Sequence, residues 1–299
     1  METNILLESG TNELEILEFC VGNQHYGINV AKVKEILLYQ TPTMVPNSHP
    51  SIEGIFMPRN EIITVVSLFK SLNIHDNGNT ETDMMIVTNF NQLSVGFHVS
   101  SVQGIHRVSW ENISKPDVTL NTTASSVATG IIKLGEKLII ILDFEKIVAD
   151  VSPSTSLKIE EVRELGDRQR NTKPILIAED SPMLEKLIKD CLEEAGYNNI
   201  TITSNGQEAW NLLELYKQQN VVDERVACII TDIEMPQMDG HHLTKLVKTD
   251  NELKHIPVVI FSSLVNEEMR RKGESLGADA QISKPEIGML VEMIDNFLF

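Results

Sequence analysis

Side chains suited to phosphoryl chemistry recur in the second half of the chain, each directly after a short apolar run. They are Glu179 and Asp180, Asp232, Ser262, and Lys284. Three carboxylates brought together repel one another, and a divalent cation with oxygen ligands, naturally Mg²⁺, relieves that repulsion. An aspartate beside such a cation can attack a phosphoryl donor while a hydroxyl and an ammonium group neutralise the phosphoryl oxygens. The set therefore predicts phosphoryl transfer to Asp232.

These side chains meet only if the apolar runs form one parallel sheet. The pattern predicts five short strands, at residues 175–178, 200–203, 227–231, 258–261 and 280–282. Amphipathic helices are predicted between and after them, at 182–195, 206–219, 240–250, 267–276 and 286–298. Five strand–helix units predict a doubly wound, flavodoxin-like α/β fold. In such sheets ligands bind beyond the carboxyl ends of the strands, where the candidate residues fall.

Residues 173–299 resemble the response-regulator receiver family. The resemblance rests on five motifs: Ile175–Ser181, Thr231–Pro236 around Asp232, Asp239-Gly240, Ser262, and Lys284-Pro285. It implies that Asp232 is the phosphoacceptor and that Ser262 and Lys284 contact the phosphoryl group. It also implies Mg²⁺ ligands: Asp180 and Asp232 directly, Glu179 through water, and Glu234 through its backbone carbonyl.

Simpler interpretations exist for single members of this set. Any one carboxylate is most often a solvated loop acid, and Asp180 is also suited to cap a helix. His241 and His242 together could suggest a metal site, but adjacent helix residues point in different directions, so both are interpreted as surface residues. Gln281 stands where many receivers carry an aromatic residue, so switching by burial of a ring is not expected here.

The first half of the chain reads as short strands and contains an internal repeat. The segment 27–36 matches 96–105, with Gly, Val, Val and Ile at the same spacing. The segment 54–66 matches 130–142, including the turn at Arg59-Asn60 against Gly135-Glu136. Two copies of one strand plan predict two similar β subdomains.

This half, over about residues 13–150, resembles the CheW family of chemotaxis coupling proteins. The residues that carry the resemblance are Tyr26–Ile36, Gly54–Leu68 with its Arg59, and Thr129–Leu134 with Leu138–Asp143. The resemblance implies two five-stranded SH3-like barrels without catalytic activity, which link chemoreceptor tips to the histidine kinase CheA. The chain departs from the family at Pro58-Arg59-Asn60, where Leu-Arg-Gly is favoured, and at Ser67, where Asp is favoured.

Three residues are candidates for partner binding in this half: Val33, Ile36 and Arg59. The second copy of the turn holds Gly135, so the fold itself does not require an arginine there. An arginine at a hairpin tip directs five donors toward solvent or a partner. A solvated surface residue is the simpler interpretation of Arg59, and core packing is the simpler one for Val33 and Ile36.

Charge and composition limit the choice of partners. The net charge is −18, with 17 acidic against 9 basic residues in 1–157 and 22 against 12 in 173–299. Such a balance opposes nucleic acid and anionic membranes as partners. Residues 158–172 are charged and are expected to form a solvated connector with at most a short helix. The absence of a signal-like start or long apolar run predicts a cytoplasmic protein, and three cysteines without metal-like spacing predict buried thiols.

The pairing of the two halves resembles the CheV family: a coupling domain at 1–157, a linker at 158–172 and a receiver at 173–299. That resemblance implies a coupling protein tuned by phosphorylation and not an enzyme. A haloacid-dehalogenase-type hydrolase would need Asp-x-Asp after the first strand, and a transcription factor would need a basic recognition helix. A receptor methylesterase would need a nucleophile elbow, and the sequence shows none of these three features.

Overall fold

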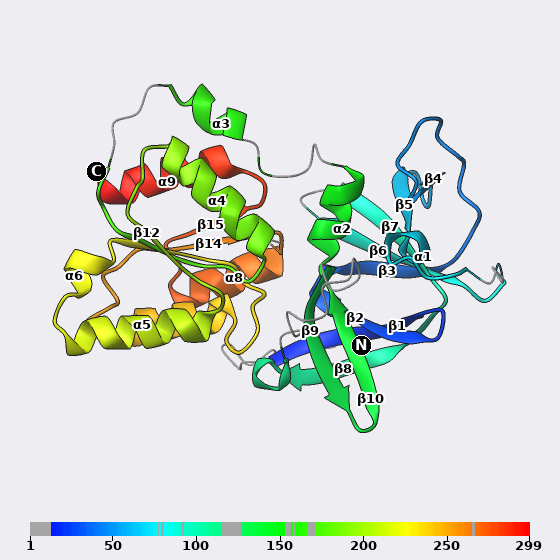
Figure 1. Ribbon diagram of the computed structural model, residues 1–299, viewed down its shortest axis with the longest axis horizontal. Coiled ribbons are helices and arrows are strands. Elements are labelled where there is room, and N and C mark those ends of the chain that lie inside the picture. The colour runs from blue at the N-terminus through cyan, green and yellow to red at the C-terminus, as the bar shows by residue number, and fades with distance from the viewer. Residues whose placement is uncertain are drawn as a thin grey trace. The chain divides into compact units, whose positions relative to one another are not determined.

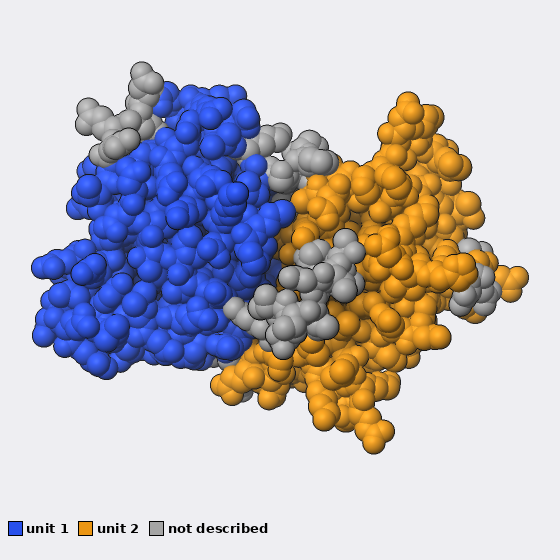
Figure 2. Space-filling view, in the orientation of Figure 1, with its two compact units in different colours: residues 1–12, 157–299 blue, residues 13–156 orange. Residues whose placement is uncertain are grey.

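The structure of the protein is a computed structural model. It describes residues 13–76, 78, 81–90, 93–114, 127–152, 157, 159–166, 171–264 and 267–299. These fall into two compact units, residues 13–156 and residues from 157 to the C-terminus, which Figure 2 colours separately. None of the helices in the described ranges has the length and apolar content that a membrane crossing requires.

The first unit is built almost entirely of strands (Figure 1). In chain order they are β1 (Glu13–Val21), β2 (Gln24–Asn29), β3 (Val33–Leu38), β4 (Ile52–Phe56), β5 (Ile63–Ser67), β6 (Met84–Phe90), β7 (Leu93–Val99), β8 (Ser101–Ser109), β9 (Ala128–Leu134) and β10 (Lys137–Leu142). Short helical segments join or follow them: η1 (Val30–Lys32), α1 (Leu68–Ser71), η2 (Trp110–Asn112) and α2 (Phe144–Val151).

The ten strands form two five-stranded sheets with the same plan. One has the order β8-β1-β2-β10-β9 and the other β3-β6-β7-β5-β4. The repeat makes β1–β5 equivalent to β6–β10, and this equivalence converts one order into the other. The predicted pair of similar β subdomains is therefore confirmed. Neither sheet is one copy of the repeat, however, because each takes strands from both.

Matching registers support the same equivalence. Gly27 of β2 lies opposite Ile141 in a parallel pair, and Gly96 of β7 lies opposite Val65 in the other sheet. A Cβ added to Gly27 would lie 2.6 Å from Ile16, and one added to Gly96 would lie 2.5 Å from Met85. Both glycines thus let the preceding strand pack closely at the same place in each sheet.

The second unit is a parallel sheet flanked by helices. Its strands are β11 (Ile175–Ala178), β12 (Ile200–Thr203), β13 (Cys228–Thr231), β14 (Val258–Ser262) and β15 (Ala280–Ser283), in the order β12-β11-β13-β14-β15. Its helices are α3 (Ile159–Glu164), α4 (Pro182–Glu194), α5 (Gly206–Gln218), α6 (Val222–Arg225), α7 (Gly240–Thr249), α8 (Glu267–Leu276) and α9 (Ile287–Leu298). This confirms the flavodoxin-like prediction, to which the structure adds the short α6.

Alternate residues of each strand enter different cores, as the period of a strand requires. Ile175 and Ile177 pack with residues of α4 and α9, whereas Leu176 and Ala178 pack with residues of α5 and α7. Both faces of the sheet are thereby covered. This leaves the carboxyl ends of the strands as the rim at which polar side chains can gather. All three cysteines are buried and unpaired, as predicted.

The segment expected to be a solvated connector is partly built into the second unit. Val162 of α3 is 1% exposed and Leu157 is 6% exposed, and both belong to the core that contains α4 and α9. The connector predicted at 158–172 contains the expected short helix, α3, but the expectation of solvation was wrong for Val162, because the charged composition concealed an apolar side. Leu157, assigned from sequence to the coupling domain, belongs to the second unit.

Candidate phosphoryl-acceptor site

The ends of four strands bring the predicted polar residues to one rim. Glu179 and Asp180 follow β11 and Asp232 follows β13, while Ser262 ends β14 and Lys284 follows β15. Backbone hydrogen bonds hold these ends together. The Asp232 N–H donates to the Ala178 carbonyl at 2.9 Å, and the Lys284 N–H donates to the Ser262 carbonyl at 3.1 Å. The sheet itself therefore sets the relative positions of these side chains.

A divalent cation fits the acidic group at this rim. Ligand oxygens of Glu179, Asp180 and Asp232 lie within 4.8 Å of one another, the one such group of three in the described part of the chain. Glu179 and Asp232 are buried, at 2% and 5% exposure. Mg²⁺ prefers oxygen ligands, and this group offers only carboxylate oxygens that are partly removed from water.

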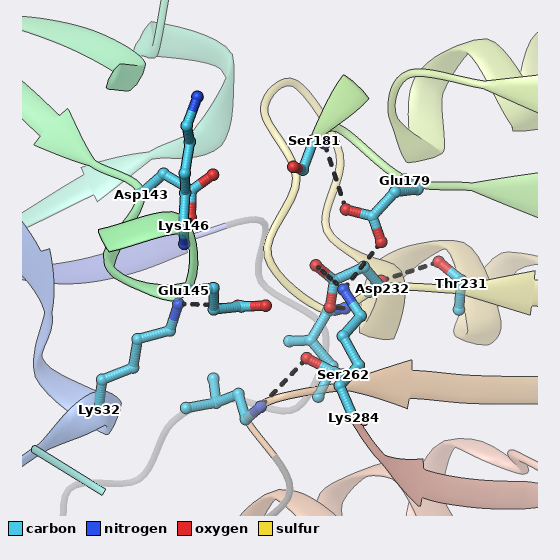
Figure 3. Close-up of polar contacts among 12 residues, drawn as sticks. Lys32, Asp143, Glu145, Lys146, Glu179, Ser181, Thr231, Asp232, Ser262 and Lys284 are labelled. Atoms are coloured by element: carbon cyan, nitrogen blue, oxygen red, sulfur yellow. Dashed lines mark hydrogen bonds and ion pairs between the residues drawn. The ribbon is translucent and has the colours of Figure 1, made fainter. Parts of the chain in front are cut away.

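Lys284 supplies the positive charge inside this group (Figure 3). Its Nζ lies 2.8 Å from Glu179 Oε2 and 3.3 Å from Asp232 Oδ2, and the residue is 2% exposed. One ammonium group against three carboxylates leaves a formal excess of two negative charges. A buried charge excess of this kind is costly without a further cation, which strengthens the case for a metal.

The Asp232 carboxylate is held by its own loop. The Ile233 N–H donates to Asp232 Oδ1 at 2.7 Å, and the Thr231 hydroxyl donates to the Asp232 carbonyl at 2.9 Å. Gly240, the first residue of α7, approaches so closely that a Cβ there would lie 1.9 Å from that carbonyl oxygen. The Asp239-Gly240 pair is therefore needed to bring α7 against the loop.

Ser262 lies at the same rim with its hydroxyl directed to its own loop. Ser262 Oγ accepts a hydrogen bond from the Leu264 N–H at 3.2 Å, and the residue is fully buried. To contact a phosphoryl group on Asp232, the hydroxyl would have to exchange this partner.

Glu234 lies two positions beyond Asp232, in the loop before α7. The binding of a metal by its carbonyl stays a prediction. His241 is 1% exposed, so its expected surface position was wrong. Burial, with Lys272 nearby, lowers the pKa of His241 to about 3, so this imidazole is neutral. The Gln281 amide donates to the Arg270 carbonyl of α8 at 2.7 Å.

In the first unit the structure separates the three partner-binding candidates. The Arg59 side chain is 83% exposed and its guanidinium lies 3.3 Å from Glu35, while Ile36 of the adjacent β3 is 38% exposed. Val33 is partly buried against the core between the two sheets. Ile36 and Arg59 are thus both exposed, whereas Val33 contributes to packing.

The first unit also exposes apolar side chains that sequence reasoning missed. Leu38, Met57 and Ile62 are 66%, 61% and 66% exposed. The repeat contained the signal, because the equivalents of Ile36 and Ile62 are Ile105 and Leu138, each 59% exposed. Apolar residues that stay exposed at the same positions of both copies are not explained by either core.

A buried charged network lies inside the first unit. His98 Nδ1 is 3.0 Å from Glu53 and its Nε2 is 3.0 Å from Asp83, so both ring nitrogens face carboxylates. Tyr39 donates to Glu53 at 2.9 Å and stacks on the imidazole. Burial disfavours the charged imidazole, but the bonds and charges of Glu53 and Asp83 outweigh it and raise the pKa of His98. No sequence pattern signals this network, because its members are far apart in the chain.

Comparison with known proteins agrees with this division. Residues 15–152 match the model of the CheW-like domain, and residues 175–295 match that of the response regulator receiver domain. The chain is 30% identical to chemotaxis protein CheV3 of Helicobacter pylori over 96% of its own length and 95% of the relative's. It is 27% identical to CheV2 of the same organism, over 92% and 90% of the two chains.

A CheW-like domain followed by a receiver domain defines a chemotaxis coupling protein that carries its own regulatory domain. Because the similarity spans both domains and nearly the whole length, the chain belongs to the CheV family of chemotaxis proteins. Receiver domains in general bind Mg²⁺ at their acidic site, and the three carboxylates described above have the composition that such a site needs.

Proposed function

We propose that this protein couples chemoreceptors to the histidine kinase CheA, and that phosphorylation of Asp232 tunes this coupling. The observation that supports it most directly is the Lys284 ammonium group placed 3.3 Å from Asp232 and 2.8 Å from Glu179. A buried lysine shared by the two acids is arranged for a further anionic group on Asp232.

In the proposed reaction an Asp232 carboxylate oxygen attacks phosphorus, and the bond from phosphorus to the donor's phosphohistidine nitrogen breaks. The Ile233 N–H fixes the orientation of the carboxylate through its bond to Oδ1. Lys284 neutralises charge on the phosphoryl oxygens, and Ser262 donates its hydroxyl to one of them. Mg²⁺ bound by Glu179, Asp180, Asp232 and the Glu234 carbonyl would supply the remaining positive charge. The acceptor itself forms the product, so no separate catalytic domain is required.

The partner surface proposed for the coupling unit is centred on Arg59. Ile36, Leu38 and Ile62 of the same unit are exposed apolar residues that could contribute to it. Interface hot spots commonly combine an arginine with apolar contacts, which supports this surface as the kinase or receptor contact. The acidic balance of both units argues against nucleic acid or an anionic membrane surface as an alternative partner.

Phosphorylation is tested by labelling with acetyl phosphate, with and without Mg²⁺. The wild-type protein should gain one phosphoryl group only when Mg²⁺ is present, and Asp232→Asn should gain none because the amide is not a nucleophile. Asp223→Asn is the matched control, since Asp223 is exposed and lies in α6 away from the site. Full labelling of Asp232→Asn, read by intact mass, would exclude Asp232 as the acceptor.

A further inference from the structure

Helix α3 is anchored on the receiver by a small apolar side. Val162 and Leu157 are buried, and Ile159 and Leu165 are partly buried beside them. These four residues pack in the core formed with α4 and α9, and Figure 1 shows α3 beside those two helices. The polar link is a surface ion pair from Arg163 to Glu194 at 2.7 Å, which adds little stability in water. Docking therefore depends on a few apolar contacts of a six-residue helix.

The contact of α3 on α9 lies close in sequence to Lys284, which faces the proposed phosphorylation site. A Cβ at Gly288, in the first turn of α9, would lie 3.7 Å from Glu161 of α3. Ile287 before it is fully buried in the core that holds Val162. Lys284, the residue that faces Asp232 and Glu179, precedes Ile287 by three positions. The segment from Lys284 to Gly288 thus contacts the acidic site through Lys284 and contacts α3 through Gly288.

We propose that α3 is a releasable strap, whose docking on α4 and α9 is weakened when Asp232 carries a phosphoryl group. This inference rests on the proposed phosphorylation of Asp232. A phosphoryl group adds close to two negative charges beside Lys284 and draws the ammonium group away from Glu179. Because Lys284 leads directly into α9, its movement shifts the first turn of α9. In the unmodified protein α3 packs against that turn, so a shift of the turn weakens the packing of α3.

Release of the strap changes how the two units are tethered. With α3 docked, five residues, 152–156, separate the end of α2 from Leu157. With α3 released, nineteen residues, 152–170, precede Asn171, which forms a bridge with Tyr197 in the receiver. Extended chain spans roughly 3.4 Å per residue, so the maximal reach grows from about 17 Å to about 65 Å. A longer tether lowers the effective concentration of the receiver near the coupling unit.

The strap is tested by hydrogen–deuterium exchange of the α3 amides in the full-length protein, with Mg²⁺ and with or without beryllofluoride as the phosphoryl mimic. The wild-type protein should exchange these amides at least about 5-fold faster with beryllofluoride, a typical lower bound for coupled sites. Val162→Ser should show fast exchange in both states. Glu164→Ser, on the exposed side of the same helix, should behave as the wild type.

Reciprocity gives a second readout. If bound beryllofluoride releases α3, then Val162→Ser must bind beryllofluoride more tightly by the same factor. Unchanged or slower α3 exchange in protein that has bound beryllofluoride would overturn the strap and leave the proposed phosphorylation intact. Failure of beryllofluoride to bind at Asp232, seen as no difference between wild type and Asp232→Asn in ¹⁹F spectra, would overturn both.

Discussion

Arg59 occupies a backbone conformation that L-residues rarely adopt. Its φ is 50°, and the equivalent residue of the second copy, Gly135, has a φ of 62°. The left-handed region costs a non-glycine residue about 1–2 kcal/mol, so glycine is the favourable choice at this turn. The partner contact proposed above would account for an arginine at this position despite that cost.

Arg59→Gly should therefore weaken binding without weakening the fold. We expect the free energy of unfolding to change by no more than about 1 kcal/mol, because relief of strain offsets the added freedom of the unfolded chain. Affinity for the kinase should fall by roughly 5–30-fold, the loss for an arginine worth about 1–2 kcal/mol. Calorimetric titration and thermal melting measure the two quantities. Asn60→Gly, with φ 74° in the same turn, is the control and should keep full affinity; a large stability loss in Arg59→Gly would make Arg59 structural.

The buried network around His98 predicts a pH-dependent stability of the coupling unit. The pKa of His98 is raised in the folded state. Its contribution to the free energy of unfolding is therefore complete below its unfolded pKa of about 6.5 and is lost as the pH rises through the folded pKa. The pKa of Glu53 is lowered, since the bond from His98 outweighs its burial, so its contribution is lost only in acid.

His98→Gln should accordingly destabilise the unit by roughly 3 kcal/mol at pH 6 and by clearly less at pH 9. Denaturant unfolding of Trp210→Phe protein isolates the signal of Trp110 in the coupling unit, since the chain has two tryptophans. His75→Gln, at an exposed position, should lower stability at neither pH. An equal effect of His98→Gln at the two pH values would show that folding does not raise the pKa of His98.

At the scale of elements, the two copies of the repeat allow a matched comparison of glycines. Gly27→Ala would press against the branched Ile16 side chain at 2.6 Å, and Gly96→Ala against the thioether of Met85 at 2.5 Å. Methionine adapts its shape more readily than isoleucine. Gly27→Ala should lower the free energy of unfolding by about 1–3 kcal/mol, the usual effect of overpacking, and Gly96→Ala should lower it by less. Gly104→Ala, with no atom within 4 Å, is the control in unfolding experiments; equal costs at Gly27 and Gly96 would contradict the packing argument.

The strands of the receiver were predictable because each is a continuous apolar run that ends in a polar residue. The expected ends match β11 and β12, and the others differ by one residue. The coupling unit was predictable only as two similar β subdomains. Repeat matching shows which strands are equivalent but not which strands pair, and pairing across the copies is decided by the packed core that the two sheets share.

The site was predictable where parallel strands converge and not elsewhere. Glu179, Asp232 and Lys284 meet because sheet geometry brings strand ends together whatever their separation in sequence. The burial of His241 and the docking of Val162 depend on which side of a short helix faces a neighbour, and a few turns give too weak a pattern to decide this. The His98 network depends on three-dimensional packing alone.

For the whole molecule, the account joins an adaptor to a receiver in one chain. The receiver unit follows the coupling unit, and its acidic site lies at the ends of the strands that lead into α4, α7, α8 and α9. A charge added at Asp232 can therefore reach the helices that surround the site. Coupling between separate sites is typically about 1–3 kcal/mol, or roughly 5–150-fold in affinity.

The most direct test is the affinity of the full-length protein for reconstituted receptor–kinase complexes, measured with Mg²⁺ in the presence and absence of beryllofluoride. The account predicts a change of at least about 5-fold between the two states in the wild type and no change in Asp232→Asn. Equal affinity and equal kinase output in both states, in protein shown to bind beryllofluoride at Asp232, would contradict it and leave the receiver uncoupled from the adaptor.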